Sequence, residues 1–174
     1  RLLAIVPNIK GTKSALKFEQ LSYLGFPFSI SNTFLKRNIK SSIKESFETA
    51  CRINDLANAY NKELILYLSM AFGNNYGEEW SYELLEDWVG KLSDQGIQTI
   101  SLSDTIGIGT PTQIGEVFSR IINSFPDIEF GLDQRPRSGS DVLLNREVIR
   151  LFNASVNPNR TFVLSKRLPP IDKD

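Results

Sequence analysis

The sequence predicts an α/β fold in which about five parallel strands alternate with helices. Short apolar runs recur along the chain, and amphipathic patterns with three- and four-residue spacing lie between them. Strands that alternate with helices in this way are typical of βα units around a parallel sheet. The chain has 174 residues, of which 41% are hydrophobic and 23% charged, so we expect one domain with a packed core.

The expected strands are the short apolar runs, which occupy residues 2–6, 26–30, 64–70, 98–102 and 128–132. Four helices are expected between them, at about 14–23, 42–60, 81–95 and 110–125. Cap residues support the last three helices. Ser42 and Glu45 form a capping box, Gly96 ends the next helix, and Thr110 precedes Pro111 at the start of the last one.

A change in composition follows Leu132. Residues 133–174 hold eight basic and five acidic side chains, whereas residues 1–132 hold twelve and fifteen. The segment that begins at residue 133 is rich in turn residues and lacks periodicity. We therefore expect residues 1–132 to form the α/β unit and residues 133–174 to be a divergent basic tail. Within that tail, a short helix is expected at 142–152 and a short strand at 161–164.

The composition excludes several kinds of site. The chain has no histidine, so a Ser-His-Asp triad, a Cys-His pair and every histidine-containing metal site are excluded for this chain acting alone. Cys51 is the only cysteine, which rules out an internal disulfide and favours a reducing compartment, the cytoplasm. Basic and acidic residues number 20 each and no long apolar run exists, so we expect neither a nucleic-acid nor a membrane partner.

The candidate binding residues lie mostly at the carboxyl ends of the expected strands, where ligands bind in parallel α/β folds. They comprise an amide and an ammonium group after the first strand, and hydroxyls and one carboxylate near the ends of the second and fourth: Asn8, Lys10, Ser31, Ser101, Asp104 and Thr105. The aspartate also has a purely structural interpretation, because a carboxylate at a strand end can cap a loop by accepting backbone N–H bonds.

Four stretches of this sequence resemble hydroxymethylglutaryl-CoA lyases in order and spacing. The longest is Ser101-Leu-Ser-Asp-Thr-Ile-Gly-Ile-Gly-Thr-Pro111. The others are Pro-Asn-Ile-Lys-Gly at residues 7–11, residues 37–47, and the Tyr-Leu-Ser, glycine and Tyr-Gly elements within residues 67–77. The resemblance extends from residue 1 to about residue 132. It implies a partial TIM (β/α) barrel, in which the expected strands are the third to seventh of eight.

This resemblance implies the retro-Claisen cleavage of 3-hydroxy-3-methylglutaryl-CoA to acetyl-CoA and acetoacetate, assisted by a divalent metal ion, Mg²⁺ or Mn²⁺. It also implies an acyl-CoA partner and supporting substrate contacts from Ser31, Ser101, Asp104 and Thr105, which match family positions near the active-site mouth. Asn8 and Lys10 are candidates because they lie at a strand end, where Lys10 is expected near a phosphate of CoA. Two positions depart from the family: Asn32 replaces a glutamate, and Asp133-Gln-Arg135 stands where a His-x-His pair is expected. We therefore expect no tightly held metal ion and a chain that is incomplete or inactive as a lyase, and its catalytic residues stay unassigned.

Two alternatives stay open at this point. The fold alternative is an open, doubly wound sheet of five strands, which periodicity does not distinguish from a partial barrel. The functional alternative is a non-catalytic acyl-CoA-binding or scaffold module derived from the same barrel. A half-built barrel leaves sheet edges unpaired, so a homo-oligomer formed through those edges is also expected.

Overall fold

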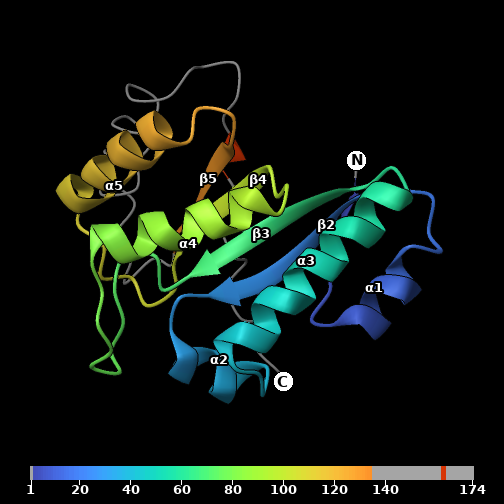
Figure 1. Cartoon of the computed structure of the whole chain (residues 1–174), viewed down its shortest axis with the longest axis horizontal. Helices are drawn as coiled ribbons and strands as arrows, with labels where there is room; N and C mark the ends of the chain where they lie inside the picture. The colour runs from blue at the N-terminus through green and yellow to red at the C-terminus, as the bar shows by residue number, and fades with distance from the viewer. Residues whose placement is uncertain (1, 135–161, 164–174) are drawn as a thin grey trace, which may run out of the picture.

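The computed structural model describes residues 2–134 and 162–163 (Figure 1). The strands are β1 (Leu2–Ile5), β2 (Leu21–Ser29), β3 (Glu63–Ser69), β4 (Thr99–Asp104), β5 (Glu129–Gln134) and β6 (Phe162–Val163). The helices are α1 (Ile9–Ala15), α2 (Asn32–Asn38), α3 (Ile43–Ala59), α4 (Tyr82–Asp94) and α5 (Pro111–Ser124). The six described strands form one sheet in chain order, and every neighbouring pair is parallel. The predicted parallel α/β fold is confirmed.

Helices α3, α4 and α5 begin and end close to their predicted positions because their caps form as expected. The Ser42 hydroxyl accepts from the Glu45 N–H while the Glu45 carboxylate accepts from the Ser42 N–H, which completes the capping box. The Ser81 and Thr110 hydroxyls cap α4 and α5 in the same way, and Pro111 is the first residue of α5.

The first predicted helix, at residues 14–23, is wrong. Helix α1 begins earlier because the Asn8 side chain accepts a hydrogen bond from the Gly11 N–H at 2.9 Å. Residues 21–29 instead form β2, which pairs with strands on both sides, so sheet pairing outweighs the local pattern. The structure also contains a short helix that the pattern missed, α2, which begins after its cap residue Ser31.

Two predictions for the basic tail have different outcomes. The predicted strand at 161–164 is confirmed as β6, which pairs in parallel with β5 through Gly131 and Leu132. Strand β5 itself continues to Gln134, two residues beyond the boundary placed after Leu132. The helix predicted at 142–152 lies outside the described residues.

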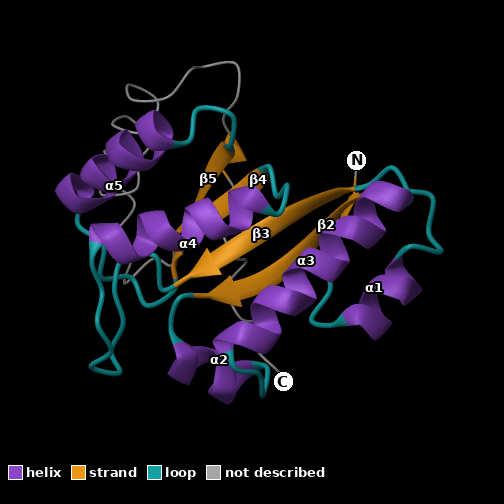
Figure 2. Ribbon diagram, viewed as in Figure 1, coloured by secondary structure: helices purple, strands orange, loops and turns teal. Residues whose placement is uncertain are grey.

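Side chains of the sheet alternate between two faces, as strand geometry requires. One face is apolar and packs against the helices; its buried residues are Leu24, Phe26, Phe28, Leu64, Leu66, Leu68, Ile100, Leu102, Phe130 and Leu132. Figure 2 shows α3 and α4 lying across this same side of the sheet. Burying each of these large side chains contributes about 1.5–3 kcal/mol. We call the opposite face the inner face.

The arrangement of the helices favours a barrel segment over a doubly wound sheet. A doubly wound sheet carries helices on both faces, whereas a (β/α) barrel carries them on its outer face alone. The described helices that pack on the core lie on one side of this sheet (Figure 2). No helix within residues 2–134 and 162–163 combines the length and apolar character needed to cross a membrane.

Candidate functional site

The strand register places four polar residues in one row on the inner face, at the carboxyl ends of β2 to β5. Ser29 lies beside Ser69, Ser69 beside Ser103, and Ser103 beside Asp133. The Ser29 hydroxyl donates to the backbone carbonyl of Ser69 at 3.0 Å. The Ser103 hydroxyl donates to the Asp133 carboxylate at 3.4 Å. This "rim row" is therefore a continuous line of hydroxyls that ends in a carboxylate.

A second row lies one layer deeper and contains Pro27, Tyr67, Ser101 and Gly131. Ser101 is 1% exposed, and its hydroxyl has no hydrogen-bond partner within the described ranges. Because a buried hydroxyl without a partner is costly, such a group indicates a position where a ligand or water oxygen binds. Gly131 has no side chain to fill the space beside this hydroxyl.

The Tyr67 hydroxyl belongs to the same inner face. Burial raises the pKa of Tyr67, and the negative charge of Asp133 raises it further. Tyr67 is therefore a neutral hydrogen-bond donor at neutral pH. The Tyr67 ring and the Ile5 side chain pack against Gly25, since a Cβ atom added there would lie 2.9 Å from Tyr67 Cε2 and 2.5 Å from Ile5 Cδ1.

Asp104 is the last residue of β4 and is 1% exposed. Its Oδ1 atom accepts from the Ile108 N–H at 3.0 Å, and its Oδ2 atom accepts from the Gly109 N–H at 3.0 Å. Thr105 follows, and its hydroxyl accepts from the Met70 N–H at 3.0 Å. These contacts hold the loop after β4 and tie it to the end of β3. Asp104 therefore has the geometry of a loop cap, as its purely structural interpretation predicted.

Ser31 and Asn8 act as N-caps in this structure. The Ser31 hydroxyl accepts from the Phe34 N–H at 3.1 Å and donates to the Glu78 carboxylate. The Asn8 side chain caps α1, and Lys10 is exposed in the first turn of that helix. Of the six residues expected to bind substrate, only Ser101 therefore presents an unpartnered buried polar group to the inner face.

Lys10 is one of several exposed basic residues in the first part of the chain. Residues 2–44 hold a single acidic residue, Glu19, and seven basic ones, and all seven are exposed: Lys10, Lys13, Lys17, Lys36, Arg37, Lys40 and Lys44. These residues lie on α1 and α2, in the turns that follow these helices, and at the start of α3. The excess of positive charge in this part of the chain favours phosphate and carboxylate groups.

Sequence reasoning did not include Ser29, Ser69, Tyr67 or Glu78 among the site residues. A signal for the first three was present, because polar residues alternate with large apolar ones toward the ends of β2, β3 and β4. That pattern is typical of strands with one apolar and one polar face. Glu78 had no local signal, because its partners Ser31 and Thr33 are more than forty residues away in the sequence.

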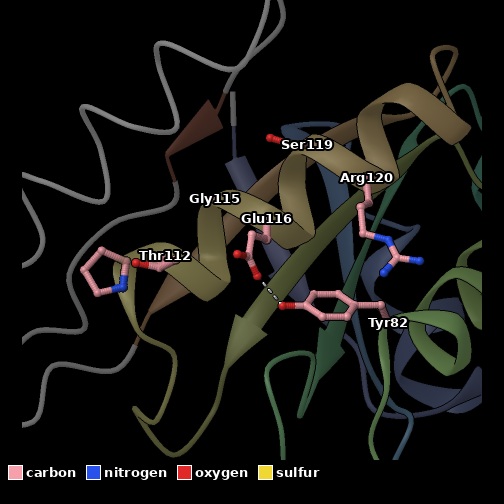
Figure 3. Close-up of a pocket in the computed structure, with 7 residues that line it drawn as sticks. Tyr82, Thr112, Gly115, Glu116, Ser119 and Arg120 are labelled. Carbon is pink, nitrogen blue, oxygen red and sulfur yellow. Dashed lines mark hydrogen bonds between the residues drawn. The ribbon is translucent and has the colours of Figure 1, made fainter.

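A separate hollow lies between α4 and α5 (Figure 3). It has a volume of about 640 Å³ and opens to solvent. The Tyr82 hydroxyl donates to the Glu116 carboxylate at 2.7 Å, and the Arg120 guanidinium lies 4.7 Å from the centre of the tyrosine ring. Its lining comes from the helix layer and contributes nothing to the inner-face rows.

The described residues do not fit a divalent-metal site. No group of three or more His, Cys, Asp or Glu side chains that could hold a metal ion occurs within residues 2–134 and 162–163. Asp133 contributes the one carboxylate of the rim row, where its neighbours are serine hydroxyls. Neutral hydroxyls are weak ligands compared with the carboxylates and imidazoles that dominate metal sites in proteins.

The chain is similar to lyases in both sequence and fold. The model of the HMGL-like family matches residues 3–132. Human mitochondrial hydroxymethylglutaryl-CoA lyase is 32% identical over 122 residues, which cover 70% of this chain and 37% of that protein. Hydroxymethylglutaryl-CoA lyase YngG of Bacillus subtilis is 32% identical over 129 residues, which cover 74% of this chain and 43% of that protein.

Solved structures of lyases share the fold of this chain. The crystal structure of the Bacillus subtilis HMG-CoA lyase superposes with a TM-score of 0.76 at 28% identity and covers 86% of this chain and 50% of that chain. An HMG-CoA lyase from Acinetobacter baumannii, solved in complex with coenzyme A and 3-methylmalate, superposes with a TM-score of 0.75 at 20% identity. This second match covers 92% of this chain and 50% of that chain.

These matches decide between the two fold alternatives. The parallel sheet is part of a TIM-type barrel, and the doubly wound alternative is wrong. The chain spans about half the length of the solved lyases and less than half of the sequence relatives named above. Because the family match covers most of the sequence, from residue 3 to residue 132, this chain belongs to the HMGL-like family.

Proposed function

We propose that this chain binds 3-hydroxy-3-methylglutaryl-CoA or a closely similar acyl-CoA on its inner face, and that it does not cleave that ligand by itself. The observation that carries the proposal is the buried, unpartnered hydroxyl of Ser101. The acyl group of this ligand has a hydroxyl and a carboxylate, and either can satisfy a serine O–H. Family membership and the coenzyme A bound to the Acinetobacter relative support the choice of ligand.

Each part of the site has a distinct task in this proposal. Ser101 and the neutral Tyr67 hydroxyl donate hydrogen bonds to oxygen atoms of the acyl group. Asp104 and Thr105 act indirectly by holding the loop at the mouth. The exposed basic residues of this part of the chain, Lys10 among them, attract the phosphates of coenzyme A, and Asn8 caps the helix that carries this lysine.

Cleavage requires more than the described residues supply. In a retro-Claisen reaction a base removes the hydroxyl proton, the carbon–carbon bond breaks, and the resulting carbanion is stabilised and then protonated. In the family a divalent metal supplies electrophilic stabilisation, but the residues that the structure describes do not form its site. Histidine is also absent from the whole sequence, so no imidazole base is available within the chain.

Isothermal titration calorimetry with 3-hydroxy-3-methylglutaryl-CoA tests the binding proposal. We expect measurable affinity and an increase of about tenfold in the dissociation constant for Ser101→Ala, since one buried hydrogen bond is lost. Ser119→Ala is the matched control, because this serine is exposed on α5. Equal affinities for the wild type and the Ser101→Ala variant would contradict the proposal.

A turnover assay tests the claim that the isolated chain is inactive. Acetyl-CoA and acetoacetate are measured with 3-hydroxy-3-methylglutaryl-CoA in the presence of Mg²⁺ or Mn²⁺. We expect no metal-dependent product. Turnover that a chelator abolishes and added metal restores would show that the chain is a lyase in its own right.

A second candidate function is that of a subunit whose barrel is completed by association with another copy of the chain. The β1 edge of the sheet favours this candidate. At the β1 edge, Leu2 is 58% exposed and Ile5 is 56% exposed, although both are apolar. We propose that this edge pairs with another copy of the chain, as unpaired parallel edges favour association. Sedimentation velocity should show a concentration-dependent oligomer that Ile5→Lys converts to a monomer.

We also propose a cytoplasmic location, supported by the single thiol Cys51.

A further inference from the structure

The loop after β3 is fastened to the start of α2 by one carboxylate. Glu78 Oε1 accepts from the Thr33 N–H at 2.9 Å and from the Thr33 hydroxyl at 2.7 Å. Glu78 Oε2 accepts from the Ser31 hydroxyl. Three donors from the cap and the first turn of α2 therefore converge on a side chain from the next βα unit. Hydrogen bonds to an ionised carboxylate are stronger than neutral ones, so this is a firm attachment.

The loop is also shaped so that it presents this carboxylate. The Asn74 side-chain oxygen accepts from the Tyr76 N–H at 3.0 Å and from the Glu78 N–H at 3.1 Å. The Asn74 amide donates to the Glu78 carbonyl at 2.9 Å. Gly77 has a φ of 71°, a conformation that glycine adopts without steric cost. These contacts hold the backbone of Glu78 in the position from which its side chain reaches α2.

A second contact joins the same two segments. The Arg37 guanidinium from α2 lies 5.0 Å from the centre of the Tyr76 ring in the loop. Lys36, also on α2, exerts a favourable charge interaction on Glu78. The carboxylate, the ring and the two cations therefore form one unit at the carboxyl ends of β2 and β3. If the loop detached from α2, Arg37 would lose its support.

We propose that Glu78 is a positioning residue that fastens loop 73–78 to α2 and thereby holds Arg37 where it contacts an anionic group of the bound acyl-CoA. The identity of that ligand rests on the proposed function. The attachment of the loop does not. This role also engages the Ser31 hydroxyl, which donates to Glu78 and accepts from the Phe34 N–H.

Glu78→Gln is the test variant, and Glu79→Gln is its matched control. Glu79 is the next residue in the chain and is exposed. Amide hydrogen exchange at Thr33 and Tyr76 reports the attachment of the loop without any ligand. At neutral pH we expect about tenfold faster exchange at both amides in Glu78→Gln and no change in Glu79→Gln. Unchanged exchange in Glu78→Gln would overturn the attachment.

The pH dependence separates the carboxylate from a purely steric effect. Partial burial acts to raise the pKa of Glu78, but hydrogen bonds from Ser31 and Thr33 outweigh it, so the pKa lies below its ordinary value of 4.5. The attachment is therefore fully present above about pH 4.5 and is lost as the pH falls through the lower folded value. We expect this loss of protection in the wild type and its absence in Glu78→Gln. Identical pH profiles would contradict the inference.

A double-mutant cycle with Arg37→Gln tests whether Glu78 acts through this arginine. We expect Glu78→Gln to weaken 3-hydroxy-3-methylglutaryl-CoA binding about tenfold in the wild type and to have little further effect in the Arg37→Gln background. Fully additive losses would overturn the positioning role. If the wild type does not bind the ligand at all, the proposed function fails, while the exchange experiment still decides whether the loop is attached.

Discussion

The replacement Asp104→Asn is expected to destabilise the fold strongly, because this buried carboxylate caps two backbone N–H groups. Asn keeps one acceptor oxygen, so it retains one of the two bonds to Ile108 and Gly109. Its amide N–H₂ then faces the other N–H, which leaves a buried donor without a partner. A hydrogen bond to a charged acceptor contributes about 1.5–3 kcal/mol, and a buried unpaired group costs about 1–3 kcal/mol. We expect a net loss of about 2–4 kcal/mol in the free energy of unfolding.

Urea denaturation followed by the fluorescence of Trp80 and Trp88 measures this loss. The midpoint should fall while the slope of the free energy against urea stays unchanged. Asp127→Asn is the control, since this aspartate is exposed, and it should change the stability by less than about 0.5 kcal/mol. If Asp104→Asn behaved like that control, the carboxylate would not stabilise the fold as a loop cap.

Three further predictions concern the core and the inner face. Ser101→Ala should leave stability unchanged or raise it by up to about 1 kcal/mol, because it removes an unsatisfied buried hydroxyl; urea denaturation measures this. Leu66→Ala should cost about 2–5 kcal/mol, whereas Leu2→Ala at the exposed edge should cost much less, by the same assay. Absorbance titration at alkaline pH should show Tyr67 ionising above its ordinary value of 10.0, and Asp133→Asn should lower that value.

Ionisation of Tyr67 also makes the stability of the fold decrease as the pH rises into the alkaline range. Because the pKa of Tyr67 is raised in the folded state, its contribution to stability is complete below the unfolded value of 10.0 and is lost as the pH rises toward the folded value. Tyr67→Phe removes this dependence. A variant whose alkaline unfolding matched the wild type would contradict the assignment.

Local signals predicted the elements that depend on local contacts. The capping box at Ser42 and the Thr110-Pro111 start are formed within four residues, so α3 and α5 were placed correctly. Strand β2 was missed at its start because pairing with β1 and β3 decides its length, and neither partner is adjacent in sequence. Of the candidate residues, Ser101 is buried with an unpartnered hydroxyl, and Ser31 and Asn8 cap helices. Contacts of these residues with a substrate stay predictions.

The sequence by itself determined that the protein is a parallel α/β domain of lyase type and that no imidazole chemistry is available within the chain. The alternation of strands and helices is sufficient for the fold class and the composition for the missing imidazole, while the lyase relationship rests on the resemblance of four stretches to that family. The tertiary structure decided which polar groups share a surface. Strand register brings Ser69 beside Ser103, and loop path brings Glu78 to Ser31, which is 47 residues away. Such contacts depend on how distant segments pack, and no local pattern encodes that packing.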